Sequence, residues 1–325
     1  MQREVKFSIQ SWVLKEPFSI TGHTFTEVKL LFVEIKQGGY TGRGEASGVY
    51  YLDETGSSML AQVKHVKQAL ENGADRHAID KLLSAGGARN AIDCALWDLE
   101  CKILGQYIWS SIGLIPKQVC TVNTVGIDTP ELMAKKAKTI DAKNIKVKID
   151  GNQPLEQITA VCLARPNANI VVDVNQGWNF GQLQEFAPKF KALGVKMIEQ
   201  PLPRGHDSEL ENYSSPLPLC ADESCLDSSE LIKASKRYQM INIKLDKTGG
   251  LTEALVLAEK AKSLGMGLMV GNMMGTSLAM APAFVIAQLC DFVDLDGALF
   301  LVKDRSNAMS YEGGVVSIFN SALWG

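Results

Sequence analysis

Carboxylates end three successive apolar, strand-like runs in the second half of the chain. The runs close as Val172-Asp173, Ile198-Glu199 and Ala221-Asp222. Burying carboxylates side by side is costly unless a cation neutralises them. A hard divalent ion with oxygen ligands provides that charge, and Mg²⁺ suits a site that keeps positions open for substrate oxygens. We therefore predict one Mg²⁺ ion per active site, with Asp173, Glu199 and Asp222 as its ligands.

Lysines end the neighbouring runs. Lys146 and Lys148 precede the first carboxylate, and Lys244 follows the last. In an eight-stranded barrel the second and sixth strands lie opposite each other, so we expect Lys148 and Lys244 to face each other across the mouth. An apolar setting and neighbouring cations lower the pKa of an amine. Two such bases on opposite faces of one carbon predict 1,1-proton transfer, meaning racemisation or epimerisation, with the metal stabilising an enediolate.

A repeat of strand-like and helix-like segments must position these side chains. Strand-like runs begin 22 to 27 residues apart, near Val119, Asn144, Asn169, Val195, Leu217, Met240, Gly267 and Phe292. Helical periodicity lies between most of them, in Pro130 to Thr139, Leu183 to Leu193, Ser228 to Ser235 and Leu251 to Ser263. This alternation predicts an α/β fold with a parallel, TIM-like β/α barrel. Such barrels carry their chemistry at the carboxyl ends of the strands, where the charged residues lie.

The first hundred or so residues read as a small α+β unit. Strands are predicted over Val5 to Leu14, Val28 to Lys36 and Tyr40 to Ala46, with a turn at Gln37-Gly38-Gly39. Two loops, Lys15 to Glu27 and Ser47 to Gly56, interrupt the pattern. Helices are predicted over Ser58 to Glu71 and from Ala88 onward.

Composition and missing motifs exclude several function classes. The net charge is −3, so no nucleic-acid footprint is expected, and no apolar run has the length of a membrane span or a signal peptide. The seven cysteines are odd in number and include no CxxC pair. The HExxH, P-loop and GxGxxG motifs are absent. We expect a cytoplasmic enzyme acting on a small molecule.

The chain resembles the muconate-lactonizing subgroup of the enolase superfamily along its whole length. The matching motifs are Lys146-Val-Lys148, Asp173-Val-Asn175-Gln-Gly-Trp178, Glu199-Gln-Pro-Leu202, Ala221-Asp222-Glu223-Ser224 and Asn242-Ile-Lys244-Leu-Asp-Lys-Thr-Gly-Gly250. The resemblance implies a modified (β/α)7β barrel over residues 116–300. It also implies an N-terminal capping domain over 1–115 and a C-terminal segment, 301–325, that returns to it. Lys148 and Lys244 then form the acid/base pair, and Lys146 assists carboxylate binding.

Asp294-Leu-Asp296 is similar to the motif by which dipeptide epimerases of this subgroup bind a substrate's α-ammonium group. It implies an epimerase that inverts the α-carbon of the C-terminal residue of L-Ala-X dipeptides. We also expect a homo-oligomer, although the sequence does not fix the number of subunits. Thr124, Met273 and Tyr51 are further candidates for substrate contact.

The identity of X depends on the first loop of the capping unit. In relatives specific for L-Ala-Glu, an Arg in this loop pairs with the side-chain carboxylate. The corresponding stretch, Pro17 to Glu27, holds no Arg, and Phe25 stands near its place. A charge-assisted hydrogen bond would be lost, so we predict a neutral, apolar X with a broad range. His23 can still pair with an acidic X, and Phe25 can equally serve loop packing.

Other functions remain open at this point. One is an L-Ala-D/L-Glu epimerase. Another is a cycloisomerase or an o-succinylbenzoate synthase-like lyase, which shares the lysines but gives Asp294 and Asp296 no task. A third is a non-catalytic binder, for which replacing Lys148 or Lys244 by Ala would preserve ligand affinity.

Overall fold

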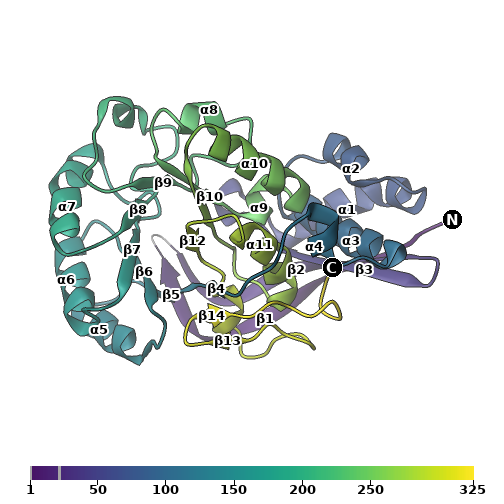
Figure 1. The fold of residues 1–325 in the computed structure, drawn as a ribbon, viewed down its shortest axis with the longest axis horizontal. Helices are drawn as coiled ribbons and strands as arrows, with labels where there is room; N and C mark the ends of the chain where they lie inside the picture. Colours follow the sequence, from purple (N-terminus) through teal and green to yellow (C-terminus); the bar gives the residue numbers. More distant parts are fainter. Residues whose placement is uncertain (1, 21–22) are drawn as a thin grey trace.

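Eight parallel strands, hydrogen-bonded in chain order, form the larger unit of the computed structural model, which describes residues 2–20 and 23–325 (Figure 1). They are β5 (Val122–Val125), β6 (Asn144–Lys148), β7 (Asn169–Asp173), β8 (Met197–Glu199), β9 (Leu219–Ala221), β10 (Met240–Ile243), β11 (Gly267–Val270) and β12 (Phe292–Val293). The connecting helices are α5 (Pro130–Thr139), α6 (Pro154–Ala164), α7 (Phe180–Ala192), α8 (Leu231–Ala234), α9 (Leu245–Thr248), α10 (Leu251–Ser263) and α11 (Ser277–Ala287). Between β8 and β9 the crossover holds the 3₁₀ segment Ser208–Asn212 instead. The predicted parallel β/α barrel is confirmed.

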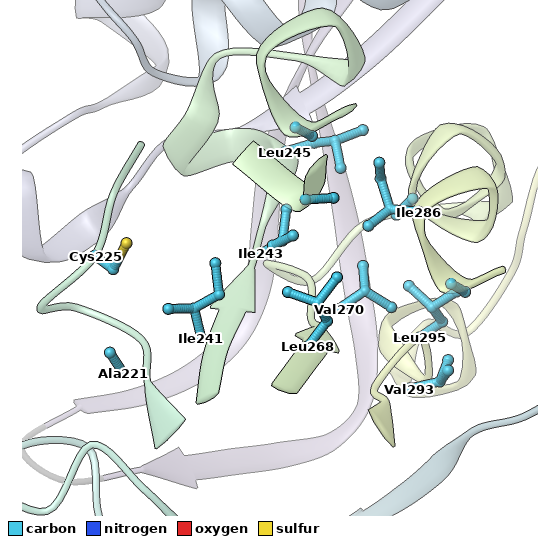
Figure 2. Packing of buried hydrophobic residues seen from close by; sticks show 14 of the residues in the cluster. Ala221, Cys225, Ile241, Ile243, Leu245, Leu268, Val270, Ile286, Val293 and Leu295 are labelled. Atoms are coloured by element: carbon cyan, nitrogen blue, oxygen red, sulfur yellow. The ribbon is translucent and has the colours of Figure 1, made fainter. Parts of the chain in front are cut away.

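Alternation along each barrel strand separates an outer apolar layer from the barrel interior. Ile241 and Ile243 of β10 join Ile286 of α11 in the outer cluster (Figure 2). The interior holds a separate cluster of Val122, Val171, Met197, Cys220, Met240 and Met269. Because side chains at i and i+2 share a face, the residue two places after each of these faces the barrel mouth. Asp173, Glu199, Asp222 and Asn242 all stand at that position.

The N-terminal unit is a three-stranded antiparallel sheet with helices. Its strands are β1 (Glu4–Ile20), β2 (His23–Gln37) and β3 (Tyr40–Ser47), and its helices are α1 (Gly56–Glu71), α2 (Arg76–Leu82), α3 (Gly87–Leu104) and α4 (Ile108–Ile112). The predicted loop over Lys15 to Glu27 is wrong outside residues 21 and 22, which lie outside the described part of the chain. Phe18 pairs with Phe25 and Ile20 with His23, after a register shift beyond Val13. Strand pairing thus continues to the tip of the hairpin despite its Thr, Ser and Gly content.

Helix α3 fastens this unit to the barrel segment that follows β10. Arg89 donates a hydrogen bond to the Thr248 carbonyl at 2.6 Å, and Asn90 donates to Asp246 at 3.1 Å. Asp93 accepts hydrogen bonds from the Thr252 backbone N–H at 3.0 Å and hydroxyl at 2.5 Å. The residues directly after Lys244 are therefore held by the N-terminal unit as well as by the barrel.

The last residues run back across both units. β13 (Tyr311–Glu312) and β14 (Val315–Val316) form a second small sheet with β4 (Val119–Cys120). The prediction that a barrel strand begins near Val119 is therefore wrong, and the first barrel strand begins at Val122. Trp324 Nε1 donates to the Cys94 carbonyl of α3 at 2.9 Å. The domain boundaries at 115/116 and 300/301 remain predictions.

The described residues include no helix that is both long and apolar enough to cross a membrane.

The Gly249→Ala variant tests the contact between α3 and the barrel. Gly249 has φ +74°, and an added Cβ would lie 2.2 Å from Nε of Arg89, a buried side chain that Asp80 and Thr248 hold in place. Gly265 has almost the same φ, +73°, but nothing within 4 Å. We expect Gly265→Ala to cost about 1 kcal/mol through backbone strain, and Gly249→Ala to cost a further 1–3 kcal/mol or so through overpacking. Thermal unfolding measures both, and equal losses would contradict the tight contact.

Candidate active site

A cavity of about 100 Å³ lies between the barrel mouth and the N-terminal unit. Barrel residues supply its charged wall: Lys148, Asn175, Asp222, Glu223 and Lys244. The N-terminal unit contributes Phe18, Ile20, Phe25, Val28, Ser47, Gly48, Tyr50 and Tyr51, and the β11–α11 connection contributes Asn272, Met273 and Met274. Lys148 and Lys244, predicted to be opposed, thus line one cavity.

Strand register brings the predicted metal ligands together. Lys148 pairs with Asp173 across β6 and β7, and Asp173 pairs with Glu199 across β7 and β8. Asp222 comes directly after β9, the next strand in the sheet. All three carboxylates have 0% solvent exposure. At that depth their charges must be balanced by other protein groups or by a bound ion.

Lys146 is the central cation of this group. Its Nζ lies 2.9 Å from Asp173 Oδ2, 2.8 Å from Glu199 Oε2 and 2.8 Å from Asp294 Oδ2. Burial lowers the pKa of Lys146, but the three carboxylates outweigh burial and raise this pKa well above its usual value. Lys146 is therefore a permanently charged group at the centre of the carboxylates.

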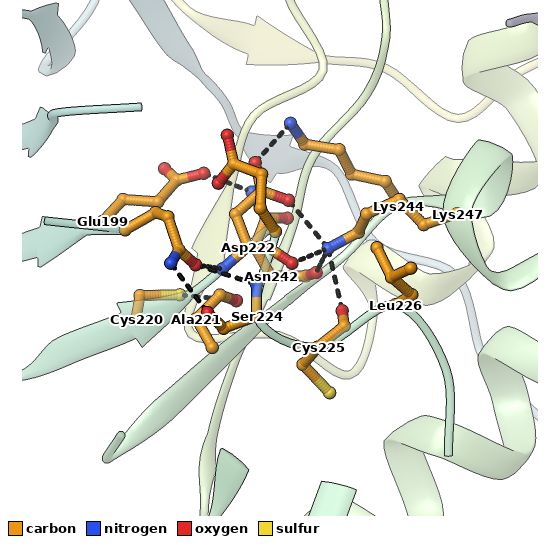
Figure 3. Close-up of polar contacts among 12 residues, drawn as sticks. Glu199, Cys220, Ala221, Asp222, Ser224, Cys225, Leu226, Asn242, Lys244 and Lys247 are labelled. Carbon is orange, nitrogen blue, oxygen red and sulfur yellow. Dashed lines mark hydrogen bonds and ion pairs between the residues drawn. The ribbon is translucent and has the colours of Figure 1, made fainter. Parts of the chain in front are cut away.

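The two lysines expected to be bases are each paired with a carboxylate. Lys148 Nζ donates to Asp173 Oδ2 at 2.6 Å and to Asn175 Oδ1 at 2.9 Å. Lys244 Nζ donates to Asp222 Oδ2 at 2.7 Å (Figure 3). Burial lowers the pKa of Lys244, but Asp222 outweighs this effect and the pKa is raised. The expectation of a lowered pKa is thus wrong for Lys244, because it counted burial and nearby cations and omitted the facing carboxylate.

The carboxylates themselves differ in their tendency to hold a proton. Burial raises the pKa of Asp173, but Lys146 and Lys148 outweigh it and lower the pKa to about 2. Burial and the Asp173 charge raise the pKa of Glu199 to about 7. Burial, followed by the charges of Asp222 and Asp173, raises the pKa of Glu223 to about 8. Groups with pKa values pushed apart in one cleft are typical of acid–base sites.

The donor set of Asp173, Glu199 and Asp222 fits a hard cation. All six side-chain oxygens are buried carboxylate oxygens, the ligand type that Mg²⁺ prefers. Glu199 Oε2 lies near the Lys146 ammonium but accepts no hydrogen bond of normal geometry, so it has a free lone pair. Within residues 2–20 and 23–325 the acidic side chains do not converge on one point closely enough to hold an ion. Ammonium groups of Lys146 and Lys244 lie against these oxygens instead.

The Asp294-Leu-Asp296 motif lies beside the cavity. Asp294 pairs with Lys146, and Asp296 Oδ2 accepts a hydrogen bond from the Thr124 backbone N–H at 2.7 Å. Burial and the neighbouring Asp294 raise the pKa of Asp296 well above its usual value. Asp296 and Thr124 line a separate groove of about 750 Å³, and Phe18 lines both this groove and the cavity. Asp296 and Thr124 thus line this groove and not the cavity that holds Lys148 and Lys244.

Aromatic residues of the N-terminal unit form the roof of the cavity. Phe25 packs against His23 at 4.2 Å and against Tyr50 at 5.8 Å between ring centroids. Tyr51 packs edge-on against Tyr50 at 5.2 Å. Phe25, Tyr51 and Met273 all line the cavity, as predicted substrate contacts should, whereas His23 does not.

Sequence reasoning missed three residues of the site. Glu223 is 1% exposed and lines the cavity, and its Oε2 has no hydrogen-bond partner among the described residues. Asn175 bonds Lys148, and Lys247 contacts Asp222. Glu223 and Lys247 lay inside the recognised motifs, but the alternation rule that singled out Asp222 and Lys244 assigns them to other faces. Unlike Asp222 and Lys244, each of which is the first residue after a strand, they lie further along the connecting segment, where side chains do not alternate between two faces.

Comparison with known proteins identifies the family. Residues 2–113 match the mandelate racemase/muconate lactonizing enzyme N-terminal domain, and residues 131–313 match the enolase C-terminal domain-like family. L-Ala-D/L-Glu epimerase of Escherichia coli K12 is 42% identical over 316 residues, covering 96% of this chain and 98% of that protein.

Two solved structures are similar throughout. One is an enolase family member from Agrobacterium tumefaciens with homology to dipeptide epimerases, solved with sodium and L-Ala-L-Glu; it is 36% identical, with TM-score 0.97, over 99% of this chain and 100% of that one. The other is a dipeptide epimerase from Enterococcus faecalis complexed with Mg and L-Leu-L-Tyr, 26% identical, with TM-score 0.91, over 98% of this chain and 97% of that one.

The fold and the site thus define an enolase-superfamily enzyme, and the chain belongs to the mandelate racemase/muconate lactonizing enzyme family. Within that family it is an isomerase of the epimerase and racemase kind.

Lys146→Met tests the charge balance of the site. Removing one member of a buried ion pair leaves an uncompensated charge, so we expect a loss of about 3–5 kcal/mol in unfolding free energy. The matched control is Lys136→Met, which removes an exposed pair with Glu16 and should cost within about 0.5 kcal/mol. Without the ammonium, the pKa values of the buried carboxylates rise above their values in the unfolded chain. The difference in unfolding free energy between the variant and the wild type should therefore shrink as the pH falls from neutral and these groups take up protons. A difference that does not change with pH would contradict this account.

Proposed function

We propose that this protein is a Mg²⁺-dependent dipeptide epimerase that inverts the α-carbon of the C-terminal residue of L-Ala-X dipeptides. The observation that carries the proposal is that two lysines, Lys148 and Lys244, line one cavity together with the carboxylate of Asp222. A binding protein needs no such bases, whereas a lyase or cycloisomerase can share both lysines and differs in giving Asp294 and Asp296 no task. A pair of amines at one cavity is what proton removal and return on opposite faces of a carbon requires.

In this mechanism the two lysines exchange roles with the direction of reaction. One amine, freed from its carboxylate partner, removes the α-proton of X. The ammonium of the other returns a proton to the opposite face, and the reverse reaction uses the same pair with roles exchanged. Asn175 bonds Lys148 at 2.9 Å and so holds one of these groups in place. Lys146, buried and permanently charged, stabilises the substrate carboxylate as negative charge develops on it.

The residues that would hold Mg²⁺ are Asp173, Glu199 and Asp222. Their buried oxygen donors and the free lone pair of Glu199 Oε2 support this assignment. When bound, the ion supplies positive charge that stabilises the enediolate form of the substrate carboxylate. The Enterococcus faecalis dipeptide epimerase, which this chain resembles over nearly its whole length, was solved with Mg.

Asp294 and Asp296 are proposed to take the α-ammonium group of the substrate, with Thr124 beside them. Both residues are buried and lie directly after β12, and Asp294 contacts Lys146 at 2.8 Å. The adjoining groove offers room for the first residue of the dipeptide. The α-ammonium group of a dipeptide would pair with these two buried carboxylates. The substrate of a cycloisomerase or lyase offers them no such cation.

For the second residue, X, we propose a neutral and mainly apolar side chain. The cavity roof is made of Phe18, Phe25, Tyr50 and Tyr51, with Met273 beside them. Among the described residues that line the cavity, Lys148 and Lys244 are the cations, and both serve the reaction. Glu223, on the same wall, offers no positive charge to pair with an acidic X. L-Ala-D/L-Glu epimerisation, the activity named for the Escherichia coli relative, is the alternative.

We further propose that the enzyme is cytoplasmic and forms a homo-oligomer. The exposed apolar side chains of Leu104, Tyr107 and Ile115, each at least 62% exposed, support an interface that includes the segment around residues 104–115.

Loss of deuterium exchange tests the two bases. In deuterated water with Mg²⁺, wild-type protein should replace the α-proton of X in both epimers, as proton NMR measures. Lys148→Ala and Lys244→Ala should each lose exchange on one epimer, by about 10²–10⁴-fold, and on opposite epimers. Chelating the metal should abolish exchange on both.

The same assay separates the competing functions. Equal loss for both epimers in either lysine variant would contradict the two-base arrangement. Asp294→Asn should weaken exchange on dipeptides and leave a lyase or cycloisomerase activity intact. No exchange on any dipeptide would favour those activities instead.

A panel of L-Ala-X dipeptides tests the side-chain specificity. We expect exchange with L-Ala-L-Phe and L-Ala-L-Leu to exceed that with L-Ala-L-Glu at least about tenfold, the value of one charge-assisted hydrogen bond. Phe25→Arg should raise exchange with L-Ala-L-Glu and lower it with L-Ala-L-Leu. Faster exchange with L-Ala-L-Glu than with the apolar dipeptides in the wild type would still support an epimerase but would overturn the assignment of Phe25.

A further inference from the structure

Lys247 is the most completely enclosed cation of the site. Its side chain is 0% exposed. Its Nζ donates to Asp222 Oδ1 at 2.7 Å and to the Asp222 carbonyl at 2.6 Å. It also donates to the carbonyls of Asn242 at 2.8 Å and Cys225 at 3.0 Å. The ammonium thus ties the end of β10 to the loop after β9.

Lys247 and Lys244 hold the two oxygens of the same carboxylate. Lys244 binds Oδ2 and lines the cavity, whereas Lys247 binds Oδ1 from another side (Figure 3). Lys247 stands in the short helix α9 that begins directly after Lys244, and it does not line the cavity; its ammonium lies among the carbonyls of Asp222, Cys225 and Asn242. It cannot meet a substrate there, and it is not one of the bases.

We infer that Lys247 is a positioning residue, which fixes the Asp222 carboxylate so that its Oδ2 edge faces the cavity and can bind the metal. This inference rests on the proposed function for the metal itself. When Lys244 leaves Oδ2, Lys247 keeps its hold on Oδ1 and on the Asp222 carbonyl. The carboxylate therefore keeps one orientation whether or not a cation occupies its other oxygen.

Charge and orientation make opposite predictions for loss of Lys247. A buried positive charge near a metal site repels the metal, so removing the charge alone would tighten Mg²⁺ binding. Removing the hydrogen bonds frees Asp222 to rotate, which weakens binding; outer partners of metal ligands are typically worth about 10–100-fold in affinity. The sign of the change thus distinguishes positioning from simple charge.

The experiment is Mg²⁺ titration of the metal-free protein by calorimetry, without substrate. Lys247→Met should weaken Mg²⁺ binding about 10–100-fold. Lys247→Arg keeps the charge and several donors and should stay closer to wild type than the Met variant. Unchanged or tighter binding in the Met variant would overturn the inference. Absence of Mg²⁺ binding in wild type would instead contradict the proposed function.

The matched control is Lys102→Met. Lys102 also donates to a fully buried aspartate, Asp98, at 2.7 Å and to a backbone carbonyl, that of Thr41, at 2.9 Å. It lies in α3, outside the carboxylate cluster, so its loss should lower stability and leave Mg²⁺ affinity unchanged. If Lys247→Met does not fold, Lys247→Gln retains a short neutral donor that cannot reach Asp222 Oδ1. It should show the same weakening, and normal affinity in that variant would overturn the inference.

Discussion

The structure depends on burying several carboxylates at one end of a barrel without leaving their charges uncompensated. Ion pairs set Asp173, Glu199, Asp222 and Asp294 against Lys146, Lys148, Lys244 and Lys247. In a medium of low dielectric, this near balance is what allows such a cluster to form at all. A cation that binds Asp173 or Asp222 would therefore compete with the ammonium groups paired with those carboxylates. The proposed chemistry uses that competition, since an amine released from its carboxylate can act as a base.

The alternation of strands accounts for how much of the site the sequence could predict. Two-residue periodicity places Asp173, Glu199 and Asp222 on the interior face, and strand order makes them neighbours. Both follow from backbone geometry alone. The ion pairs do not follow from backbone geometry alone. Asp222, the partner of Lys244, lies 22 residues away along the chain, so its effect on the pKa of Lys244 appears only when the strands are assembled. Lys247 and Glu223 could not be predicted for a related reason: they lie beyond the first residue after a strand, where the alternation of strand side chains no longer applies.

The N-terminal unit also departs from what local sequence patterns predict. Its strands and helices were predicted from local patterns, yet the hairpin over β1 and β2 runs further than its polar composition indicates. Phe18 and Phe25, at that extended end, reach over the barrel and line the cavity. Contacts with a distant part of the chain thus stabilise strand pairing that composition disfavours. The resemblance to the family marks this segment as a specificity element, but its composition does not show its conformation.

Helix α3 has a consequence for how such enzymes diverge. Because Arg89, Asn90 and Asp93 hold the segment that begins just after Lys244, the unit carrying the cavity roof also supports one wall of the reaction centre. A chimera that takes its N-terminal unit from a relative would inherit a new roof together with a new support for that wall. Selectivity and turnover would then change together. The roof can be varied independently only by substitutions in the hairpin and the loop after β3, leaving α3 in place.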